Sequence, residues 1–520
     1  MFPPVTSERV RHLQEFLRWY AANRHDFVLV DDRRSLPPSF TAELGEAGLL
    51  GLQVEPKYKG QGLTYHETAQ IMTQLAAIDI NLCIFAAVHN SVGITPIRLF
   101  GSDSLKQQVL PPLAQGIRLA GIAASEPGMG SNLGAITTFA RQAPTGGYLL
   151  DGTKKWISLG GLARHLTVFA RLQDDQGREN GISAFLVDTR SDGFTVGPEA
   201  LTIGMRAVPQ HEITLSGVHV PLENMLGEIG DGAHIAHTTF NGGRLFLTAA
   251  GIGAMKRCLQ LAYHFADQRQ IATGRLADNG LTREILAHCT ASVTAVQWLV
   301  DYITAQLDRG EQPSVLLTYT AKIIGCELTW EVVDRCVQLL GARGYLDSSL
   351  AGKFLRDYRI LRLFEGSTET LSVHLGMMIL RAPRAFTEQL IKQFDGTPAV
   401  TDAIADFSRI TAQKPADKSD RHVLASIVGR AACWIALTSV AQTAAMDSRS
   451  PMSAYALAWC EYKLAEFMAA ATREPHPGLD RPSDARISEE VQSYEAAIGA
   501  VDYHLPGEYR DLDPLLKRPH

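Results

Sequence analysis

A glutamate among apolar residues stands out in the segment Arg359–Thr370, which reads Arg-Ile-Leu-Arg-Leu-Phe-Glu-Gly-Ser-Thr-Glu-Thr. This residue, Glu365, is followed by a small, hydroxyl-rich turn. Burial disfavours the charged form of a carboxyl and raises its pKa, which makes the carboxylate a stronger base than a solvated one. Donors in the turn can hold a ligand beside it. The segment is a candidate site for proton abstraction, and a solvated charge at a helix end is the alternative.

Two further segments have compositions suited to ligand binding. The first, Ala124–Ser131, reads Ala-Ser-Glu-Pro-Gly-Met-Gly-Ser, and its glycines permit close backbone approach to an anionic group. A surface turn is the alternative for such a loop taken alone. The second contains Trp156 and Ser158, which are two residues apart and therefore point to the same face of a predicted strand. Taken alone, Trp156 is expected to be a core residue.

The sequence around these segments predicts a mainly α protein with a central β-domain. Residues 1–118 show apolar side chains three and four apart, which is typical of helices. Residues 119–230 contain short β-rich runs between Gly, Asp and Pro turns. Residues 231–385 return to long amphipathic stretches that predict a four-helix bundle. Residues 386–421 are polar and predict a linker, and residues 422–520 predict an extra helical domain.

Composition narrows the function classes. The chain has 520 residues, of which 46% are hydrophobic and 20% charged, as expected of a globular protein with several packed units. No apolar run is expected to span a bilayer, and the first residues lack a secretory pattern, so we expect a cytoplasmic protein. The seven cysteines form no Cys-x-x-Cys pair and the sixteen histidines no convincing ligand set, so we expect neither disulfides nor a metal. A net charge of −6 argues against nucleic-acid binding.

Four separated motifs resemble those of acyl-CoA dehydrogenases. Phe364–Glu369 is similar to the family's Tyr-Glu-Gly-Thr-Ser-Glu signature, and Ala124–Ser131 contains a counterpart of its Thr-Glu-Pro-Gly-Ala-Gly-Ser loop. Asp151–Gly161 resembles the family's Asn-Gly-x-Lys-x-Trp-Ile-Thr-Asn-Gly-Gly segment, and Gln338–Tyr345 resembles its Gln-x-x-Gly-Gly-x-Gly-Tyr turn. The resemblance spans about residues 40 to 380, and a helical extension beyond it is similar to the very-long-chain branch.

The resemblance implies an FAD-dependent enzyme that oxidises an acyl-CoA to the trans-2-enoyl thioester, with Glu365 as the base for the α-proton. No side chain accepts hydride, so a flavin or nicotinamide is required, and a Gly-x-Gly-x-x-Gly turn in a Rossmann context is missing. The family also implies a homotetramer or homodimer and an electron-transfer flavoprotein or similar acceptor. A few branches carry the base just before the bundle arginine, where this chain has Gly243, so Glu365 is the sole candidate.

The resemblance also assigns binding residues one by one. Substrate contacts are implied for Ser131, Arg244 and Gly366, with Arg244 near the pantetheine of the thioester. Cofactor contacts are implied for Ala124, Ser125, Gly130, Ser131, Trp156, Ser158, Arg269, Gln338, Gly341, Ser367 and Glu369. Arg269 is expected to reach the FAD pyrophosphate across a subunit interface, although Gln270–Arg275 lacks the Phe of the family pattern and shifts its Gly. Asn241 and Arg343 also depart from the family pattern.

Two alternatives keep the scaffold but change the function. The first is a biosynthetic dehydrogenase that acts on an acyl group bound to a carrier protein, which would suit the departures at Asn241 and Arg343. The second is a non-catalytic or DNA-associated member that uses the C-terminal extension. Residues 386–520 contain 14 Lys and Arg against 19 Asp and Glu, a net charge of −5 that repels phosphate and disfavours the second alternative.

Overall fold

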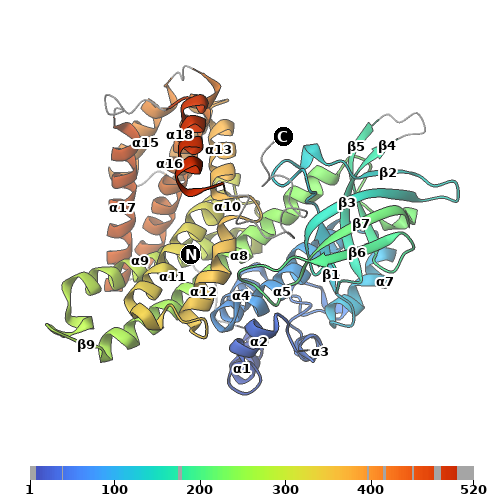
Figure 1. Cartoon of the computed structure of the whole chain (residues 1–520), viewed down its shortest axis with the longest axis horizontal. Helices are drawn as coiled ribbons and strands as arrows, with labels where there is room; N and C mark the ends of the chain where they lie inside the picture. Colours follow the sequence, from blue (N-terminus) through green and yellow to red (C-terminus); the bar gives the residue numbers. More distant parts are fainter. Residues whose placement is uncertain are drawn as a thin grey trace. The chain divides into compact units, whose positions relative to one another are not determined.

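The structure, a computed structural model, describes residues 7–37, 39–173, 179–394, 398–413, 417–447, 450–473 and 482–500. The chain divides into two compact units, Met1–Ala471 and Thr472–His520. Within the first unit, helices precede a β-sheet domain and a helical bundle follows it, as the sequence predicts (Figure 1). Parts of the predicted blocks, at 1–6, 38, 174–178, 395–397, 414–416, 448–449, 474–481 and 501–520, lie outside the described residues.

The N-terminal block is built from short helices around a buried centre. In α4, the Thr64 side chain and Glu67 form a capping box, and Ile71, Met72 and Leu75 fill one buried face. The helical elements of this block are α1 (Glu8–Asn23), α2 (Phe27–Arg33), α3 (Phe40–Glu46), η1 (Pro56–Tyr58), α4 (Tyr65–Ile78), α5 (Ile80–Ala87), the π-helix η2 (Val88–Ile94), α6 (Thr95–Phe100) and α7 (Asp103–Ala114).

The β-domain is one sheet with strand order β6-β7-β3-β2-β4-β5-β8, and β1 pairs with β4. Most pairs are antiparallel, while β4 pairs in parallel with β1 and β2. The strands are β1 (Ala120–Ala123), β2 (Phe139–Gln142), β3 (Tyr148–Ser158), β4 (His165–Gln173), β5 (Glu179–Asp188), β6 (Phe194–Glu199), β7 (Gln210–Val220) and β8 (Met225–Leu226), with the 3₁₀ turns η3 (Leu133–Ala135) and η4 (Leu222–Asn224).

A fully buried histidine joins the N-terminal block to the start of the sheet. His89 accepts a hydrogen bond at Nδ1 from the Ala120 backbone N–H (3.0 Å), and its Nε2 lies 3.0 Å from both the Leu50 and Leu113 carbonyl oxygens. Burial lowers the pKa of His89 to about 4, so the ring is neutral at physiological pH. The neutral ring thus fixes β1, which leads directly into the glycine-containing loop.

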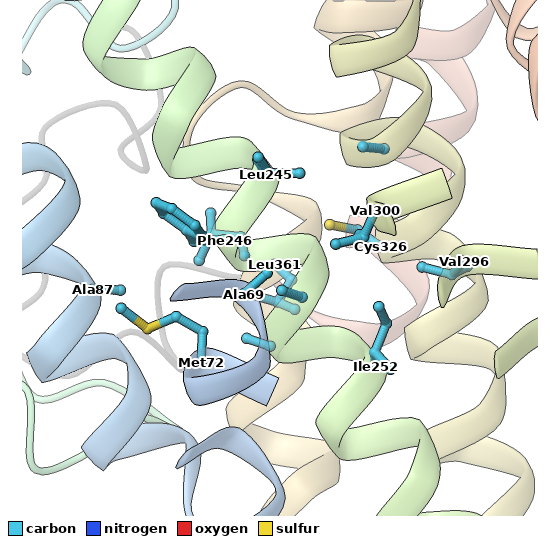
Figure 2. Packing of buried hydrophobic residues seen from close by; sticks show 14 of the residues in the cluster. Ala69, Met72, Ala87, Leu245, Phe246, Ile252, Val296, Val300, Cys326 and Leu361 are labelled. Carbon is cyan, nitrogen blue, oxygen red and sulfur yellow. The ribbon is translucent and has the colours of Figure 1, made fainter. Parts of the chain in front are cut away.

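The bundle is organised around α8 (Gly232–Gln268), which packs against α4, α9 and α11. Leu245, Phe246 and Ile252 on α8 meet Met72 on α4 and Val296 on α9 in one dense core (Figure 2). The remaining elements are β9 (Gln270–Ile271), β10 (Gly274–Arg275), η5 (Leu276–Asp278), α9 (Gly280–Asp308), α10 (Val315–Thr320), the π-helix η6 (Ala321–Gly325), α11 (Cys326–Leu340), η7 (Gly341–Arg343), α12 (Leu350–Tyr358), η8 (Arg359–Arg362) and α13 (Thr368–Ile379).

The segment 386–421 differs from the predicted linker because it contains two helices with buried faces. Helix α14 (Pro383–Phe394) and helix α15 (Pro398–Thr411) precede α16 (Lys418–Asp447) and α17 (Pro451–Thr472). In α15, Val400, Phe407 and Ile410 are almost fully buried. Polar residues dominate this stretch and suggest a linker, but its apolar residues recur at helical spacing, and that spacing produces the buried face of α15.

The extension packs closely on the bundle through α13 and α16. A Cβ at Gly376 on α13 would lie 1.7 Å from the Ala425 carbonyl oxygen, and one at Gly429 on α16 would lie 2.1 Å from the Ser372 carbonyl oxygen. Only glycine allows these two helix backbones to approach so closely. Helix α16, and α17 as far as Ala471, belong to the first unit.

Two helical stretches have the length and apolar character of a membrane span, contrary to the expectation that none would. They are Ile80–Phe100 and Lys418–Met446, and 89% and 78% of their apolar windows are buried inside the protein. Burial of that extent is typical of core helices. The second unit contains helix α18 (Asp484–Ile498), which begins at the Ser483 cap and has no buried residue.

Candidate active site

A cavity of about 540 Å³ lies where the β-domain meets the bundle. Segments far apart in the sequence line it: the glycine-containing loop, the end of β3, the first turns of α8, and the turn before α13. Of the predicted site residues, it brings together Ala124, Ser125, Gly130, Ser131, Trp156, Ser158, Arg244, Glu365 and Gly366. The three sequence segments singled out for their chemistry therefore meet at one place.

Glu365 lies in a turn with an unusual backbone. Its φ is 55° and that of Gly366 is 94°, so two consecutive residues occupy the left-handed region. Such a conformation is uncommon for a non-glycine residue and is often found at functional sites. Ser367 then starts α13 by accepting a hydrogen bond from the Thr370 backbone N–H (3.2 Å). The reversal between η8 and α13 turns the Glu365 side chain into the cavity wall.

The Glu365 carboxylate is poorly solvated and incompletely hydrogen-bonded. Its Oε2 is buried and has no hydrogen-bond partner among the described residues. Burial raises the pKa of Glu365 to about 7, while the positive charges of Arg244 and Lys322 oppose that rise. A carboxyl group in a cavity wall, with a pKa near neutrality and an oxygen that accepts no hydrogen bond from a described residue, has the properties of a general base.

Helix α8 contributes two adjacent residues that surround Glu365. A Cβ at Gly243 would lie 2.5 Å from Glu365 Oε2 and 2.6 Å from Oε1, so only glycine leaves room for the carboxylate. Arg244 donates from Nε to the Glu365 carbonyl oxygen (3.1 Å) and from Nη1 to Asn241 Oδ1 (2.9 Å). Its guanidinium also lies 5.1 Å from the centre of the Tyr319 ring. Gly243 and Arg244 thus fix where the carboxylate and its turn lie.

A second buried glutamate holds the glycine-containing loop in place. Glu126 accepts hydrogen bonds from the Thr137 backbone and hydroxyl (2.6 and 2.7 Å) and from the Thr138 backbone (3.0 Å). It also pairs with the buried Lys154 of β3 at 2.9 Å. Burial alone would raise the pKa of Glu126, but the hydrogen bonds from Thr138 and Thr137 and the Lys154 contact lower it to about 2. Lys154 also donates to the Ala124 carbonyl oxygen (3.3 Å), which ties the loop to the strand.

Trp156 lies in a β-bulge at the edge of the cavity. The register between β3 and β7 shifts between Lys154 and Ile157, and Trp156 has a φ of 62°. Bulges redirect side chains and are frequent beside active sites. The indole is 53% exposed, so the expectation of a core residue from sequence alone is wrong. The nearby Ser158 hydroxyl is 2.9 Å from the Gln210 side-chain nitrogen.

Five predicted cofactor residues lie outside the cavity lining. Ser367 is the N-cap of α13 and Glu369 is an exposed residue in its first turn. Arg269, Gln338 and Gly341 follow or end the bundle helices α8 and α11, and all three are exposed. Arg269 is 25 positions after Arg244, which places it about 37 Å along the helix at 1.5 Å per residue.

Several cavity residues were missed by the sequence analysis. Tyr319 on α10 donates to or accepts from His374 Nδ1 of α13 (2.9 Å), and His237 Nδ1 lies 3.2 Å from the Asn241 side-chain nitrogen. Val88 and Val92 of the π-helix η2 and Phe240 of α8 add apolar wall. Tyr319 lies in an apolar run that looks like core, so local sequence contains no signal for its position. Across the described part of the chain, no group of three His, Cys, Asp or Glu could hold a metal ion.

The order of domains and the cavity at their junction define a three-domain scaffold that known proteins share. Three family models match the chain: the acyl-CoA dehydrogenase N-terminal domain over 7–117, the middle domain over 121–218 and the C-terminal domain over 230–380. An acyl-CoA dehydrogenase of Bacillus subtilis (strain 168) is 31% identical over 372 residues, covering 70% of this chain and 96% of that protein. The chain belongs to the acyl-CoA dehydrogenase family.

Two further matches extend the comparison. The mitochondrial very long-chain specific acyl-CoA dehydrogenase of Macaca fascicularis is 34% identical over 339 residues. These make up 64% of this chain and 52% of that protein, so the chain spans about half the length of this relative. A Bacillus anthracis acyl-CoA dehydrogenase solved with FAD is 24% identical and shares the fold, with a TM-score of 0.79 over 94% of this chain and 92% of the other.

Proposed function

We propose that this protein is an FAD-dependent dehydrogenase that removes the α- and β-hydrogens of an acyl-CoA, with Glu365 as the base for the α-proton. The observation that supports this most directly is the Glu365 carboxylate. It lies in the cavity wall with one oxygen buried and without a hydrogen-bond partner among the described residues. The loop and strand that the resemblance assigns to the cofactor line the same cavity. Its pKa of about 7 suits proton abstraction at neutral pH.

The residues of the cavity fit a flavin. The half-exposed Trp156 indole presents a flat aromatic surface to the cavity, against which a flavin ring can pack. A Cβ at Gly128 or Gly130 would meet nothing within 4 Å, so the loop backbone is open to a ligand on that side. Ala124, Ser125, Ser131 and Ser158 would complete the contacts. FAD bound here would supply the acceptor for the β-hydride, which no side chain can provide.

The protein's own contribution is to orient the thioester and take the proton. We expect the Glu365 backbone N–H to donate to the thioester carbonyl oxygen and so stabilise the charge that develops when the α-proton leaves. Arg244 holds the next peptide unit, between Glu365 and Gly366, through the Glu365 carbonyl oxygen, which keeps the turn fixed. Glu365 then carries the proton, and the apolar wall of Val88, Val92 and Phe240 limits access of water.

The test follows the visible spectrum of the purified protein during anaerobic addition of saturated acyl-CoAs. We expect at least one acyl-CoA to bleach the oxidised flavin band. We expect Glu365→Gln to keep a yellow flavin that substrate no longer reduces, while Glu388→Gln, an exposed glutamate on α14, behaves like the wild type. Normal reduction in Glu365→Gln would refute the assignment of the base. Reduction only by acyl groups on a carrier protein would instead support the biosynthetic alternative.

We further propose that a second copy of the chain completes the cofactor site. Arg269 is about 37 Å along α8 from Arg244, too far to contact a group at the cavity beside Glu365 through the same helix. Arg269, Gln338 and Gly341 are nevertheless exposed and have the residue types expected of FAD contacts. If Arg269 binds the FAD of the neighbouring copy, Arg269→Ala should release FAD while the dimer or tetramer stays intact. Sedimentation analysis of this variant tests the proposal.

A further inference from the structure

One buried lysine near the site has no role in the chemistry described so far. Lys322 lies in the π-helix η6 between α10 and α11 and is only 1% exposed. Burying an ammonium group is costly unless it is paired. The other fully buried lysines face carboxylates, Lys154 with Glu126 at 2.9 Å and Lys353 with Asp79 at 2.8 Å. Lys322 forms no ion pair with a described residue, so its burial needs another explanation.

Two contacts of Lys322 fall on the segment that leads into Glu365, and its positive charge also acts on the Cys326 thiol, whose rise in pKa it opposes. Its Nζ donates a hydrogen bond to the Leu361 carbonyl oxygen. The same Nζ lies 5.8 Å from the centre of the Phe364 ring, the residue immediately before Glu365. The Leu361 side chain is itself fully buried, in the same hydrophobic core as Ala69 and Phe246 (Figure 2). Lys322 therefore binds both ends of the four residues that precede the catalytic turn.

The local helix geometry is unusual at this point. Helix α10 passes into α11 through a π-helical turn, Ala321–Gly325, in which the backbone is wider than in an α-helix. Such turns are rare and are often found at functional sites. The turn places Lys322 on the side of the helix that faces the Leu361 carbonyl.

We propose that Lys322 is a positioning residue for Glu365, because it fixes the turn that presents the carboxylate and places a buried positive charge behind it. This inference rests on the proposed role of Glu365 as the base. Lys322 does not touch the cavity, which distinguishes it from Arg244 on α8. Two cations from different helices thus control one carboxylate, with Arg244 on the Glu365 carbonyl and Lys322 on the residues before it.

Other ionisable groups near Glu365 leave Lys322 as a separate source of positive charge. On α11, Glu327 is paired with Arg362 at 2.7 Å, and burial raises the pKa of the Cys326 thiol, which keeps it neutral. On the cavity side, burial lowers the pKa of His237 and of His374, and Arg244 adds to both shifts. Both shifts favour the neutral form of these two rings.

The direction of the effect on Glu365 is fixed by the sign of the charge. Burial raises the pKa of Glu365 to about 7, and the Lys322 ammonium opposes this rise. Removing the ammonium should therefore raise the pKa further. A nearby opposite charge shifts a carboxyl pKa by roughly one to three units, so we expect a shift of about one unit. At pH 7 the fraction of ionised Glu365 would then fall about fivefold.

The experiment uses the flavin-loaded protein and three substitutions at Lys322. Lys322→Gln removes the charge but keeps a donor for the Leu361 carbonyl, Lys322→Met removes both, and Lys322→Arg keeps the charge. Lys256→Met is the matched control, because Lys256 is an exposed lysine of the same bundle. It lies on α8 about 18 Å beyond Arg244 along the helix axis. Thermal unfolding establishes that each variant is folded.

Two readouts separate this inference from the proposed function. The first is the pH dependence of the anaerobic rate of flavin reduction by an acyl-CoA. The second, which requires no turnover, is an infrared titration of the protonated Glu365 carboxyl, assigned by its loss in Glu365→Gln. We expect the pH midpoint to rise by about one unit in Lys322→Gln and Lys322→Met. It should not move in Lys322→Arg or Lys256→Met.

The outcomes are distinct. An unchanged midpoint in folded Lys322→Gln and Lys322→Met, with Glu365→Gln inactive, would overturn the role of Lys322 and leave Glu365 as the base. Active Glu365→Gln would overturn the proposed function itself. If Lys322→Met does not fold, Lys322→Gln still decides the matter, because it tests the charge while retaining a hydrogen-bond donor.

Discussion

Two glutamates, each from a segment that contributes to the cavity lining, differ in almost every property except residue type. Glu126 accepts hydrogen bonds from Thr137 and Thr138 and an ion pair from Lys154, and its pKa is lowered to about 2. Glu365 has a buried Oε2 that accepts no hydrogen bond from any residue the structure describes, and its pKa is raised to about 7. Both lie within segments that the sequence analysis singled out.

The comparison shows that the hydrogen bonds a carboxylate accepts, rather than its burial, distinguish a structural carboxylate from a basic one. A carboxylate that accepts several hydrogen bonds is stabilised in its charged form and is a weak base. A buried carboxylate without such donors binds a proton readily at neutral pH. Glu126 therefore holds the loop in place, while Glu365 is available for chemistry, and substitutions at the two positions should have opposite effects on stability.

The largest effect is expected at Glu126. Glu126→Gln leaves the ammonium of Lys154 buried without its carboxylate, and breaking a buried pair in this way costs about 3–5 kcal/mol. Guanidinium unfolding measures this change. Arg141→Ala is the control, because its ion pair with Asp151 (2.7 Å) is partly exposed and should contribute only about 0–1 kcal/mol. Similar losses in both variants would contradict the role given to Glu126.

The second effect has the opposite sign. Glu365 has a pKa near 4.5 when unfolded and about 7 when folded, so its contribution to stability is present below pH 4.5 and is lost as pH rises through 7. Glu365→Gln removes this loss and should be more stable than the wild type by about 3 kcal/mol at pH 8. The two proteins should be nearly equal at pH 4. If Glu365→Gln is instead less stable than the wild type at pH 8, the folded protein must stabilise the charged Glu365 carboxylate.

The third prediction concerns the space that Glu365 requires. Gly243→Ala places a methyl group 2.5 Å from the Glu365 carboxylate, so the side chain must move. Displacement of a reacting group by about 1 Å can cost roughly 10²-fold in rate, and we expect a loss of that order in flavin reduction. Gly242→Ala is the matched control, because a Cβ there meets nothing within 4 Å. Equal rates in the two variants would show that the Glu365 carboxylate can relocate at little cost.

Much of the fold follows from patterns along the chain. Apolar spacing predicts the helical block, and β-rich runs between turns predict the sheet. The helical region expected at 422–520 contains α17 and most of α16. The prediction of a linker at 386–421 was wrong, because the polar composition of this stretch concealed the buried face of α15. Composition reports average polarity, whereas a helix needs only one apolar stripe to pack.

The site was predictable where function resides in a contiguous motif and not where it depends on tertiary contacts. Glu365 and the loop at Ala124–Ser131 could be identified from local sequence, and both line the cavity. Tyr319 and Lys322 could not, because they lie in an apolar run whose π-helical turn has no sequence signature. The exposure of Trp156 was also missed, because the bulge that redirects it depends on the register between β3 and β7.

The smallest effect on stability is expected at Ser367, a residue that the family resemblance assigns to cofactor binding. Ser367 caps α13 immediately after the catalytic turn, with its hydroxyl accepting from the Thr370 backbone N–H (3.2 Å). Loss of such a cap costs about 1 kcal/mol, so Ser367→Ala should lower the free energy of unfolding by that amount. Ser367→Asp keeps a capping oxygen and should restore most of the stability. If Ser367 also binds FAD, both variants should lose cofactor on dialysis, whereas retention of FAD in both would limit this residue to holding the helix that follows Glu365.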